Sequence, residues 1–363
     1  MQNNERYIRQ MILTGFGKPA QDALQQAKIL IVGMGGLGCP ALQYLVGAGV
    51  GNIGIIDPDT ISLSNLHRQL LYSESDIGTK KVEIAFSKMN QLNPDVMIDA
   101  YPFALTNKNA INIIQQYDLV LDATDNFPAK YIINDACVIL HKPFVYGAVT
   151  RYEGQLSLFN IPQANSRSLN YRDLFPVMPL PGEILTCEEA GVLGVLPGII
   201  GTMQAAEVIK YITGLGQTLY GRLFTYNLLT TRSFEIALNI NDKTTLIDKP
   251  SFELEDYEFS SHSMEDIPEI SVAEFNVLTL QPNVFILDVR ERHEYPPIDF
   301  ADAQIPMSEL ASAIKGLPNK EICVICHQGI RSVYAAELIK AQRNLTVYSL
   351  KGGLTAYFNQ QIV

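Results

Sequence analysis

The sequence contains no apolar run long enough to cross a membrane. The longest stretch without polar side chains, residues 190–201, includes glycine and proline and falls short of the roughly 18 apolar residues of a membrane span. The polar N-terminus, residues 1–7, leads into no apolar signal core. We therefore expect a cytoplasmic protein with no membrane segment.

Cysteine and positive charge are both scarce. The five cysteines, at positions 39, 137, 187, 323 and 326, are odd in number and irregularly spaced, so they do not predict a disulfide framework. The 27 Lys and Arg residues are outnumbered by 38 Asp and Glu residues, and the net charge of −11 argues against a nucleic-acid-binding surface. We expect free thiols and no nucleic-acid partner.

Most of the net negative charge lies in one segment. Residues 241–270 hold nine acids and two bases and show weak periodicity, which is typical of a linker. We interpret this segment as an acidic, solvated spacer between an N-terminal domain, residues 1–240, and a C-terminal domain, residues 271–363. The 47% hydrophobic content is typical of packed domains, and 363 residues are enough for two or three of them.

The N-terminal domain opens with a strand, a glycine-rich turn and a helix. An apolar, β-branched run is followed directly by Gly33-Met-Gly-Gly-Leu-Gly38 and by a predicted helix, residues 40–46. Glycines at such a turn let the backbone approach a phosphate at the helix N-terminus, and Asp57, after the next strand, could bond a ribose hydroxyl. The pattern predicts a doubly wound α/β domain that binds a nucleotide, with strands at 28–32, 52–56, 119–122 and 144–146.

Charged residues further along the chain bear on the kind of nucleotide. The glycine pattern most often indicates NAD or FAD, yet hydride transfer needs little positive charge beyond the pyrophosphate. Cleavage of a triphosphate benefits from cations on its oxygens and from a carboxylate that holds Mg²⁺, and Arg68, Lys81 and Asp125 could fill these roles. From these residues alone, phosphate chemistry, a dinucleotide oxidoreductase and a charged surface without a ligand all remain open.

Seven short motifs, in order over most of residues 1–240, together resemble the MoeB/ThiF adenylyltransferases, bacterial relatives of ubiquitin-activating enzymes. The resemblance implies that the pocket binds MgATP and adenylates the C-terminal glycine carboxylate of a ubiquitin-like sulfur-carrier protein ending in Gly-Gly, releasing pyrophosphate. It also implies a homodimer. The motifs are Arg6-Tyr-Ile-Arg9-Gln, Gly33–Gly38, Asp57-Pro-Asp59, Ser64–Gln69, Lys81, Ala123-Thr-Asp125-Asn126 and Thr186-Cys187-Glu-Glu-Ala-Gly191.

The same resemblance implies roles for individual residues. Asp125 would lie near Mg²⁺ and, with Arg68, act in catalysis. Arg9 would reach the phosphates bound by the partner subunit, and Cys187 matches the family's reactive cysteine, which can form an acyl intermediate with the activated carrier. The implied ATP-binding set comprises Arg9, Gly33, Gly35, Gly36, Asp57, Asp59, Ser64, Asn65, Leu66, His67, Arg68, Gln69, Lys81, Asp125 and Asn126.

The zinc ligands that many family members carry, two Cys-x-x-Cys pairs, are missing here. The first position reads Asn170-Tyr-Arg-Asp173, and residues 232–245 contain no cysteine. Tetrahedral zinc needs four such ligands, so we expect no structural zinc. The loss of zinc would remove one structural restraint on the loop that carries Cys187.

The C-terminal domain places a cysteine between a predicted strand, residues 321–325, and a predicted helix, residues 332–341. Another strand is predicted at 284–289. Loop amides, the helix N-terminus and Arg331 should together favour the thiolate of Cys326. Four residues separate Cys326 from Arg331, one fewer than in a phosphatase cradle, so the loop suits a persulfide.

Three motifs in residues 271–363 resemble a rhodanese domain: Asp288-Val-Arg290 through Glu294-Tyr295, the Cys326 loop, and Leu350–Leu354. Ala303–Pro306 replaces the usual Gly-His-Ile segment. On a strand, Cys323 faces away from Cys326, so we expect it, with Cys39 and Cys137, in the core. The resemblance implies that Cys326 accepts sulfane sulfur in a loop of Cys326, His327, Gln328, Gly329, Ile330, Arg331 and Ser332.

The fusion of the two domains indicates one pathway. An adenylating domain activates a carboxylate, and a tethered persulfide supplies sulfur at high effective concentration. We expect a carrier of the molybdopterin-synthase or thiamine type, and a sulfur donor such as a cysteine desulfurase or thiosulfate. Two alternatives stay open: an oxidoreductase with a sulfur-sensing module, and a nucleotide-binding protein that has lost adenylation and keeps only sulfurtransferase activity.

Overall fold

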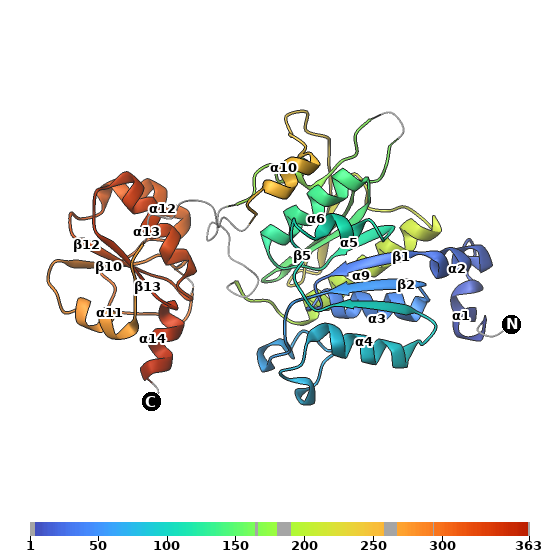
Figure 1. Cartoon of the computed structure of the whole chain (residues 1–363), viewed down its shortest axis with the longest axis horizontal. Helices are drawn as coiled ribbons and strands as arrows, with labels where there is room; N and C mark the ends of the chain where they lie inside the picture. The colour runs from blue at the N-terminus through green and yellow to red at the C-terminus, as the bar shows by residue number, and fades with distance from the viewer. Residues whose placement is uncertain (1–3, 164–165, 180–189, 258–266, 293, 362–363) are drawn as a thin grey trace. The chain divides into compact units, whose positions relative to one another are not determined.

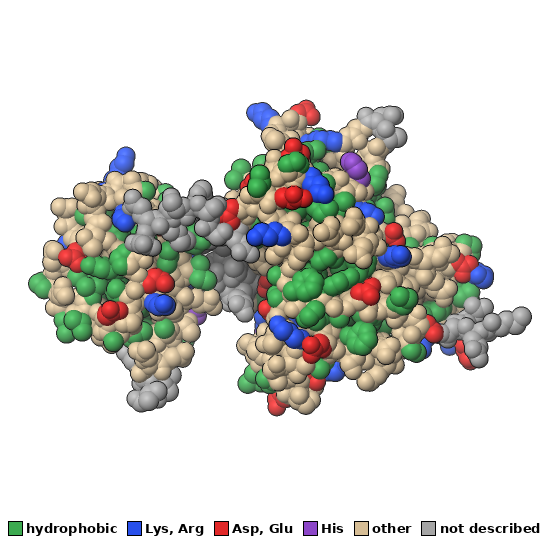
Figure 2. All heavy atoms as spheres, in the orientation of Figure 1, with side chains coloured by type: hydrophobic (Ala, Val, Ile, Leu, Met, Phe, Trp, Pro, Cys, Tyr) green, Lys and Arg blue, Asp and Glu red, His purple; other side chains and the backbone are tan. Residues whose placement is uncertain are grey.

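The computed structural model describes residues 4–163, 166–179, 190–257, 267–292 and 294–361. They form two compact units, one built around residues 4–178 and 190–257 and the other around 267–361 (Figure 1). Among these residues, no helix combines the length and the apolar character that crossing a bilayer requires. On the visible face of the larger unit, Lys and Arg side chains are scattered among Asp and Glu side chains (Figure 2).

The larger unit is built on an eight-stranded sheet in the order β3-β2-β1-β4-β5-β6-β7-β8. The first five strands of that order are parallel and the last three are antiparallel. The predicted doubly wound α/β fold is confirmed. The strands are β1 (Lys28–Val32), β2 (Asn52–Ile56), β3 (Met97–Tyr101), β4 (Leu119–Asp122), β5 (Phe144–Thr150), β6 (Glu153–Phe159), β7 (Arg222–Asn227) and β8 (Arg232–Ala237).

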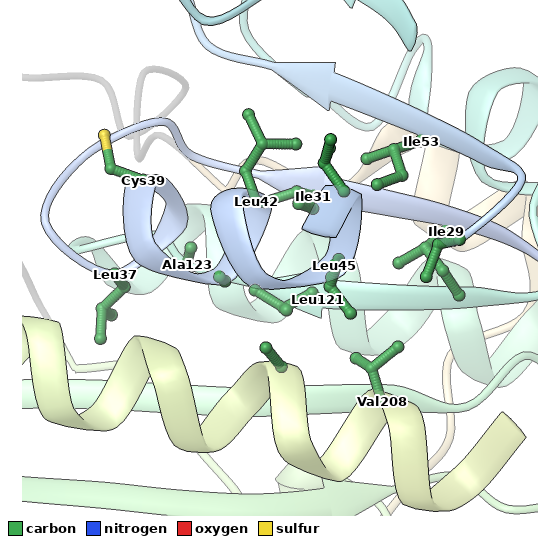
Figure 3. Close-up of a cluster of buried hydrophobic side chains, with 14 of the residues drawn as sticks. Ile29, Ile31, Leu37, Cys39, Leu42, Leu45, Ile53, Leu121, Ala123 and Val208 are labelled. Atoms are coloured by element: carbon green, nitrogen blue, oxygen red, sulfur yellow. The ribbon is translucent and has the colours of Figure 1, made fainter. Parts of the chain in front are cut away.

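Helices cover both faces of this sheet because its central strands are apolar on both sides. Ile29 and Ile31 of β1 pack with helices α2, α3, α4 and α9, whereas Leu30 and Val32 pack with α5 and α6. Figure 3 shows Leu42 and Leu45 of α3 and Val208 of α9 beside these β1 side chains. Cys39 and Cys137 are buried in these two layers, as predicted. The helices are α1 (Asn4–Met11), α2 (Gly17–Gln26), α3 (Gly38–Ala48), α4 (Lys81–Leu92), α5 (Ala110–Ile114), α6 (Phe127–Leu140), α7 (Tyr171–Leu174), α9 (Val195–Thr213) and α10 (Lys249–Leu254).

The strand order changes direction at β1. Its neighbours are β2 on one side and β4 on the other, and all three strands are parallel. In open α/β sheets, ligands bind beyond the carboxyl ends of the strands at such a point. The glycine-rich turn after β1, Asp57 after β2 and Asp125 after β4 therefore lie at one edge of the sheet.

The segment predicted as a solvated linker is partly folded onto the larger unit. Within α10, Phe252 is fully buried, and Tyr257 donates a hydrogen bond of 2.6 Å to buried Asp135 of α6. The side-chain amide of Asn107 donates to the carbonyl of Glu255. These contacts make residues 248–257 part of the larger unit, because two aromatic side chains anchor an otherwise acidic stretch.

The smaller unit is a five-stranded parallel sheet in the order β11-β10-β12-β13-β9. One face packs against α12 and α13 and the other against α11 and α14, so the predicted small α/β domain is confirmed. Its elements are β9 (Glu269–Ile270), α11 (Val272–Leu278), β10 (Val284–Asp288), β11 (Ala303–Gln304), α12 (Met307–Ala313), β12 (Glu321–Ile325), α13 (Ile330–Gln342), β13 (Val347–Leu350) and α14 (Gly353–Gln361).

Candidate nucleotide pocket and persulfide loop

A cavity of about 460 Å³ opens at the carboxyl ends of β1, β2 and β4. Four residues of the predicted ATP-binding set do not line it: Arg9, Ser64, Leu66 and His67. The cavity brings together the others, which come from five segments of the chain: Gly33, Gly35, Gly36, Asp57, Asp59, Asn65, Arg68, Gln69, Lys81, Asp125 and Asn126.

The glycine-rich turn at the cavity lies against neighbouring backbone. Gly33 has a φ of +97°, and a Cβ there would lie 2.6 Å from the carbonyl oxygen of Ala123. At Gly38, the first residue of α3, a Cβ would lie 1.9 Å from the carbonyl oxygen of Gly33. Only glycine fits both positions, and the turn leaves the N-terminus of α3 open to an anion.

A carboxylate fixes the outer edge of this turn. The two oxygens of Asp57 accept hydrogen bonds of 2.7 Å from the Met34 amide and 2.8 Å from the Asp59 amide. Burial raises the pKa of Asp57, and the ammonium group of Lys81, 4.0 Å away, opposes that rise. Lys81 also contacts Asp59 at 2.7 Å, so this cation is held at the cavity by two acids.

Two further charges enter the cavity with different degrees of restraint. The guanidinium of Arg68 donates to the Ser64 carbonyl at 2.9 Å and lies 2.7 Å from Nε2 of His67. His67 and Ser64 therefore contact Arg68 without lining the cavity. The exposed carboxylate of Asp125 makes no hydrogen bond or ion pair with any residue that the structure describes.

The cavity also contains features that the motifs do not reveal. The side-chain oxygen of Gln69 is buried and lacks a hydrogen-bond partner within the described ranges, so a ligand donor could pair with it. Thr124 and Ala129 line the wall beside Asp125, and Pro197 of α9 lies 3.0 Å from the Cβ position of Gly36. Lys130, a buried lysine in the mostly apolar helix α6, is a sequence signal that could have directed attention to this wall.

Cys187, the predicted reactive cysteine, lies outside the described residues. The region of the missing zinc ligands is described, and a polar network occupies it. Asp173 accepts two hydrogen bonds from Arg167, at 2.6 and 2.8 Å, and one from the amide of Asn241 at 3.0 Å. These donors engage both carboxylate oxygens, and no group of three or more His, Cys, Asp or Glu in the described ranges could hold a metal ion, so the residues do not fit a tetrahedral zinc site.

In the smaller unit, Cys326 lies between β12 and α13 as predicted. Its sulfur accepts hydrogen bonds from the amides of Gly329, at 3.1 Å, and Ser332, at 3.4 Å. Gly329 has a φ of +90°, and a Cβ there would lie 2.7 Å from the Gly352 amide nitrogen. The loop is thus closed by the Gly352–Gly353 turn beneath it, and its amides face the sulfur.

The partner of Arg331 differs from the expectation that it favours an anion on Cys326. Its guanidinium forms two bonds with the carboxylate of Glu294, at 2.6 and 2.8 Å. Burial alone would raise the pKa of Glu294, but the hydrogen bonds and charge of Arg331 outweigh it and hold that pKa below its usual value. Arg331 therefore fixes the loop to the chain after β10. The amides of Gly329 and Ser332 donate hydrogen bonds to the Cys326 sulfur.

The family model for the ThiF family matches residues 7–246. The chain belongs to the ThiF family. A second model, for the Rhodanese-like domain, matches residues 271–360 and so covers the unit that carries Cys326.

Curated relatives match both parts of the chain. A "Sulfur carrier protein adenylyltransferase" of Thermus thermophilus is 45% identical over 70% of this chain and 95% of its own length. A "Probable adenylyltransferase/sulfurtransferase MoeZ" of Mycobacterium tuberculosis is 35% identical over 98% of this chain and 93% of its own. An "Adenylyltransferase and sulfurtransferase MOCS3" of Culex quinquefasciatus is 36% identical over 98% and 88%.

Among solved structures, E. coli MccB matches with a TM-score of 0.59 and 20% identity, covering 68% of this chain and 75% of that one. This likeness concerns the fold alone. The MoeZ and MOCS3 relatives, which span nearly the whole chain, are named for two activities, and the matching domains are both present here. The protein is an adenylyltransferase and a sulfurtransferase.

Proposed function

We propose that this protein adenylates the C-terminal glycine of a ubiquitin-like sulfur-carrier protein and then delivers sulfur to it from a persulfide on Cys326. The carrier belongs to the class used for molybdopterin or thiamine synthesis, and the setting is the cytoplasm. The single observation that carries the first step is the cavity itself. It joins an open helix N-terminus, two cations and a carboxylate without a partner within the described residues.

The charges of the cavity suit ATP better than a dinucleotide. Arg68 and Lys81 provide positive charge for phosphate oxygens, which hydride transfer does not need. Asp125 supports Mg²⁺ binding, because this ion is commonly held by one or two carboxylates together with substrate phosphates. When bound, Mg²⁺ would neutralise charge that develops on the phosphates. Each oxygen of Asp57 accepts one amide hydrogen bond and keeps a second lone pair for a ribose hydroxyl.

The proposed chemistry balances in two stages. The carrier carboxylate attacks the α-phosphorus of ATP, a P–O bond breaks, and pyrophosphate leaves an acyl adenylate. The outer sulfur of the Cys326 persulfide then attacks the acyl carbon, and AMP leaves. A thiolate, for which Cys187 is our candidate, attacks Sγ of Cys326, which releases the thiocarboxylate and forms a disulfide that a cellular dithiol reduces.

Two further proposals concern assembly and supply. Arg9 is exposed on α1 and does not line the cavity of its own chain, which supports a homodimer in which it serves the partner's site. We propose residues 1–240 as the adenylating domain, residues 271–363 as the sulfur-transfer domain, and a connection within 241–270. A cysteine desulfurase or thiosulfate would load Cys326.

The test is ATP–pyrophosphate exchange with a panel of small carriers ending in Gly-Gly. We expect one carrier to drive exchange, Asp125→Ala to abolish it, and Cys187→Ala and Cys326→Ala to retain it, because neither thiol acts before pyrophosphate leaves. Thiocarboxylate formation on that carrier should require Cys326. If no carrier supports exchange while Cys326 still takes up sulfur, the adenylation proposal fails and only sulfur transfer stands.

A further inference from the structure

A buried ion pair lies behind the wall of the cavity that carries Asp125. Lys130, in the second turn of α6, contacts Oδ2 of Asp122, the last residue of β4, at 3.0 Å. The two side chains are 6% and 0% exposed, and neither residue lines the cavity. The pair therefore cannot touch a bound nucleotide.

Stability alone does not explain this pair. Removing two charges from water costs several kcal/mol, and replacing a buried ion pair by apolar side chains of similar volume is often neutral or stabilising. The pair lies in a layer of apolar side chains from β4, β5 and α6, where such a replacement would fit. Its hydrogen bonds indicate what else the pair does.

The three protons of the Lys130 ammonium group all have acceptors. Besides Asp122, they bond the carbonyl oxygen of Thr124 at 3.0 Å and that of Gly147 in β5 at 2.9 Å. The ammonium group also lies 5.0 Å from the ring centre of Tyr146, a favourable cation–π distance. Lys130 thus joins β4, β5 and the chain after β4 at one point.

Thr124 is held from its other side by the same pair. Oδ1 of Asp122 accepts hydrogen bonds from the Thr124 amide, at 3.0 Å, and from its hydroxyl, at 2.6 Å. Its amide, hydroxyl and carbonyl groups are all bonded within the ion pair. Asp125 is the next residue, and Asn126 after it caps α6 by accepting from the Ala129 amide at 3.0 Å.

We propose that Lys130 is a positioning residue of the nucleotide site, which acts through Thr124 to set the direction in which Asp125 enters the cavity. Asp125 has no hydrogen bond of its own to a described residue, so the backbone on either side of it determines where its carboxylate lies. The inference rests on the proposed function in one respect, that Asp125 serves Mg²⁺ and ATP.

The test compares Lys130→Met with wild type in the full chain, with Lys130→Arg as the conservative variant. Met is an unbranched side chain one atom shorter than Lys and removes its three donors, whereas Arg retains a buried cation with donors. Lys88→Met is the matched control, because Lys88 likewise bonds an aspartate, Asp76, and a carbonyl, that of Leu71, without lining the cavity.

The first readout is ATP binding by calorimetry, with and without Mg²⁺, which needs no carrier. We expect Mg²⁺ to tighten ATP binding to wild type, Lys130→Arg and Lys88→Met, and to lose this effect in Lys130→Met. In pyrophosphate exchange, kcat of Lys130→Met should fall about 100-fold, the scale expected for a group displaced by about 1 Å, with a higher Mg²⁺ requirement. Lys130→Arg should retain most of the wild-type kcat.

Equal Mg²⁺ dependence and equal kcat in Lys130→Met and wild type would overturn the inference and leave the proposed function intact. A wild type that binds no ATP would overturn both. If Lys130→Met does not fold, the inference is tested with Thr124→Val, which removes only the hydrogen bond from the Thr124 hydroxyl to Asp122. We expect it to raise the Mg²⁺ requirement several-fold, and an unchanged requirement would overturn the inference.

Discussion

At the scale of the residue, two cysteines three positions apart in one segment have opposite chemistry. Cys323 lies within β12 in the core between the sheet and α11 and α14, and burial raises the pKa of its thiol to about 12. Cys326 lies past the end of the strand, on the other face, where two amides point at its sulfur. We therefore expect Cys326, and not Cys323, to be the residue that takes up sulfur.

This contrast predicts where sulfur is loaded. After incubation with a persulfide donor, peptide mass spectrometry should find the mass of one added sulfur atom on Cys326 and none on Cys323. Cys326→Ser should abolish loading and Cys323→Ser should retain it, because serine at the buried position costs stability and leaves the loop amides in place. Sulfur on Cys323 in the Cys326→Ser variant would contradict this assignment.

Residue types and spacing were enough to predict the cavity residues Arg68, Lys81 and Asp125 and the loop cysteine. They were not enough to predict which residues the long charged side chains bind. Arg331 was expected to favour an anion on Cys326, but Glu294, 37 positions earlier, binds it instead. A long cationic side chain pairs with whichever carboxylate the fold places beside it, and that carboxylate cannot be identified from a single sequence.

At the scale of the element, the central strands could be predicted because they are short apolar runs that end in glycine or aspartate. It was harder to predict that part of the acidic segment 241–270 folds onto the larger unit. Its two buried aromatic residues, Phe252 and Tyr257, are too few to show a hydrophobic period. The Asp173 network was also difficult to predict, because Asn241 lies 68 positions after Asp173 and 74 positions after Arg167. It joins the start of α7 to the chain after β8.

This network predicts a pH-dependent contribution to stability. Burial alone would raise the pKa of Asp173, but the hydrogen bonds from Arg167, Asn170 and Asn241 outweigh it and hold the pKa below its usual value. A lowered pKa stabilises the fold above the unfolded value of about 4, and the gain is lost as the pH falls through the folded value. Asp173→Asn should therefore cost about 1–3 kcal/mol at pH 7 in thermal unfolding, and progressively less below about pH 4.

The matched control is Asp242→Asn, which changes an exposed residue next to Asn241 of the network and should lower the unfolding midpoint by far less. A zinc chelator should leave the midpoint of wild type unchanged, because the network needs no metal. A penalty for Asp173→Asn that does not shrink at all as the pH falls below about 4, or a chelator-sensitive midpoint, would contradict this account of the region.

At the scale of the whole molecule, two units on one chain serve successive steps. In the function proposed above, pyrophosphate release requires the cavity of the larger unit, and sulfur loading requires the Cys326 loop of the smaller one. Motifs in sequence order were sufficient to predict both units, because most of the motifs that the structure describes lie where a strand ends or a helix begins. The role proposed for Arg9 depends on a second chain, because Arg9 does not line the cavity of its own chain.

Mixing two inactive variants tests that role. Arg9→Ala keeps an intact cavity, and Asp125→Ala keeps an intact Arg9, so each homodimer should lack one component at both of its sites. In a mixed dimer, the cavity of the Arg9→Ala subunit receives Arg9 from its partner and works, whereas the other cavity lacks both residues. With random exchange, half of the dimers are mixed and each has one working site, so pyrophosphate exchange should recover to about a quarter of wild type. Light scattering should show a dimer throughout, and a mixture no more active than its components would mean that Arg9 does not serve a partner's cavity.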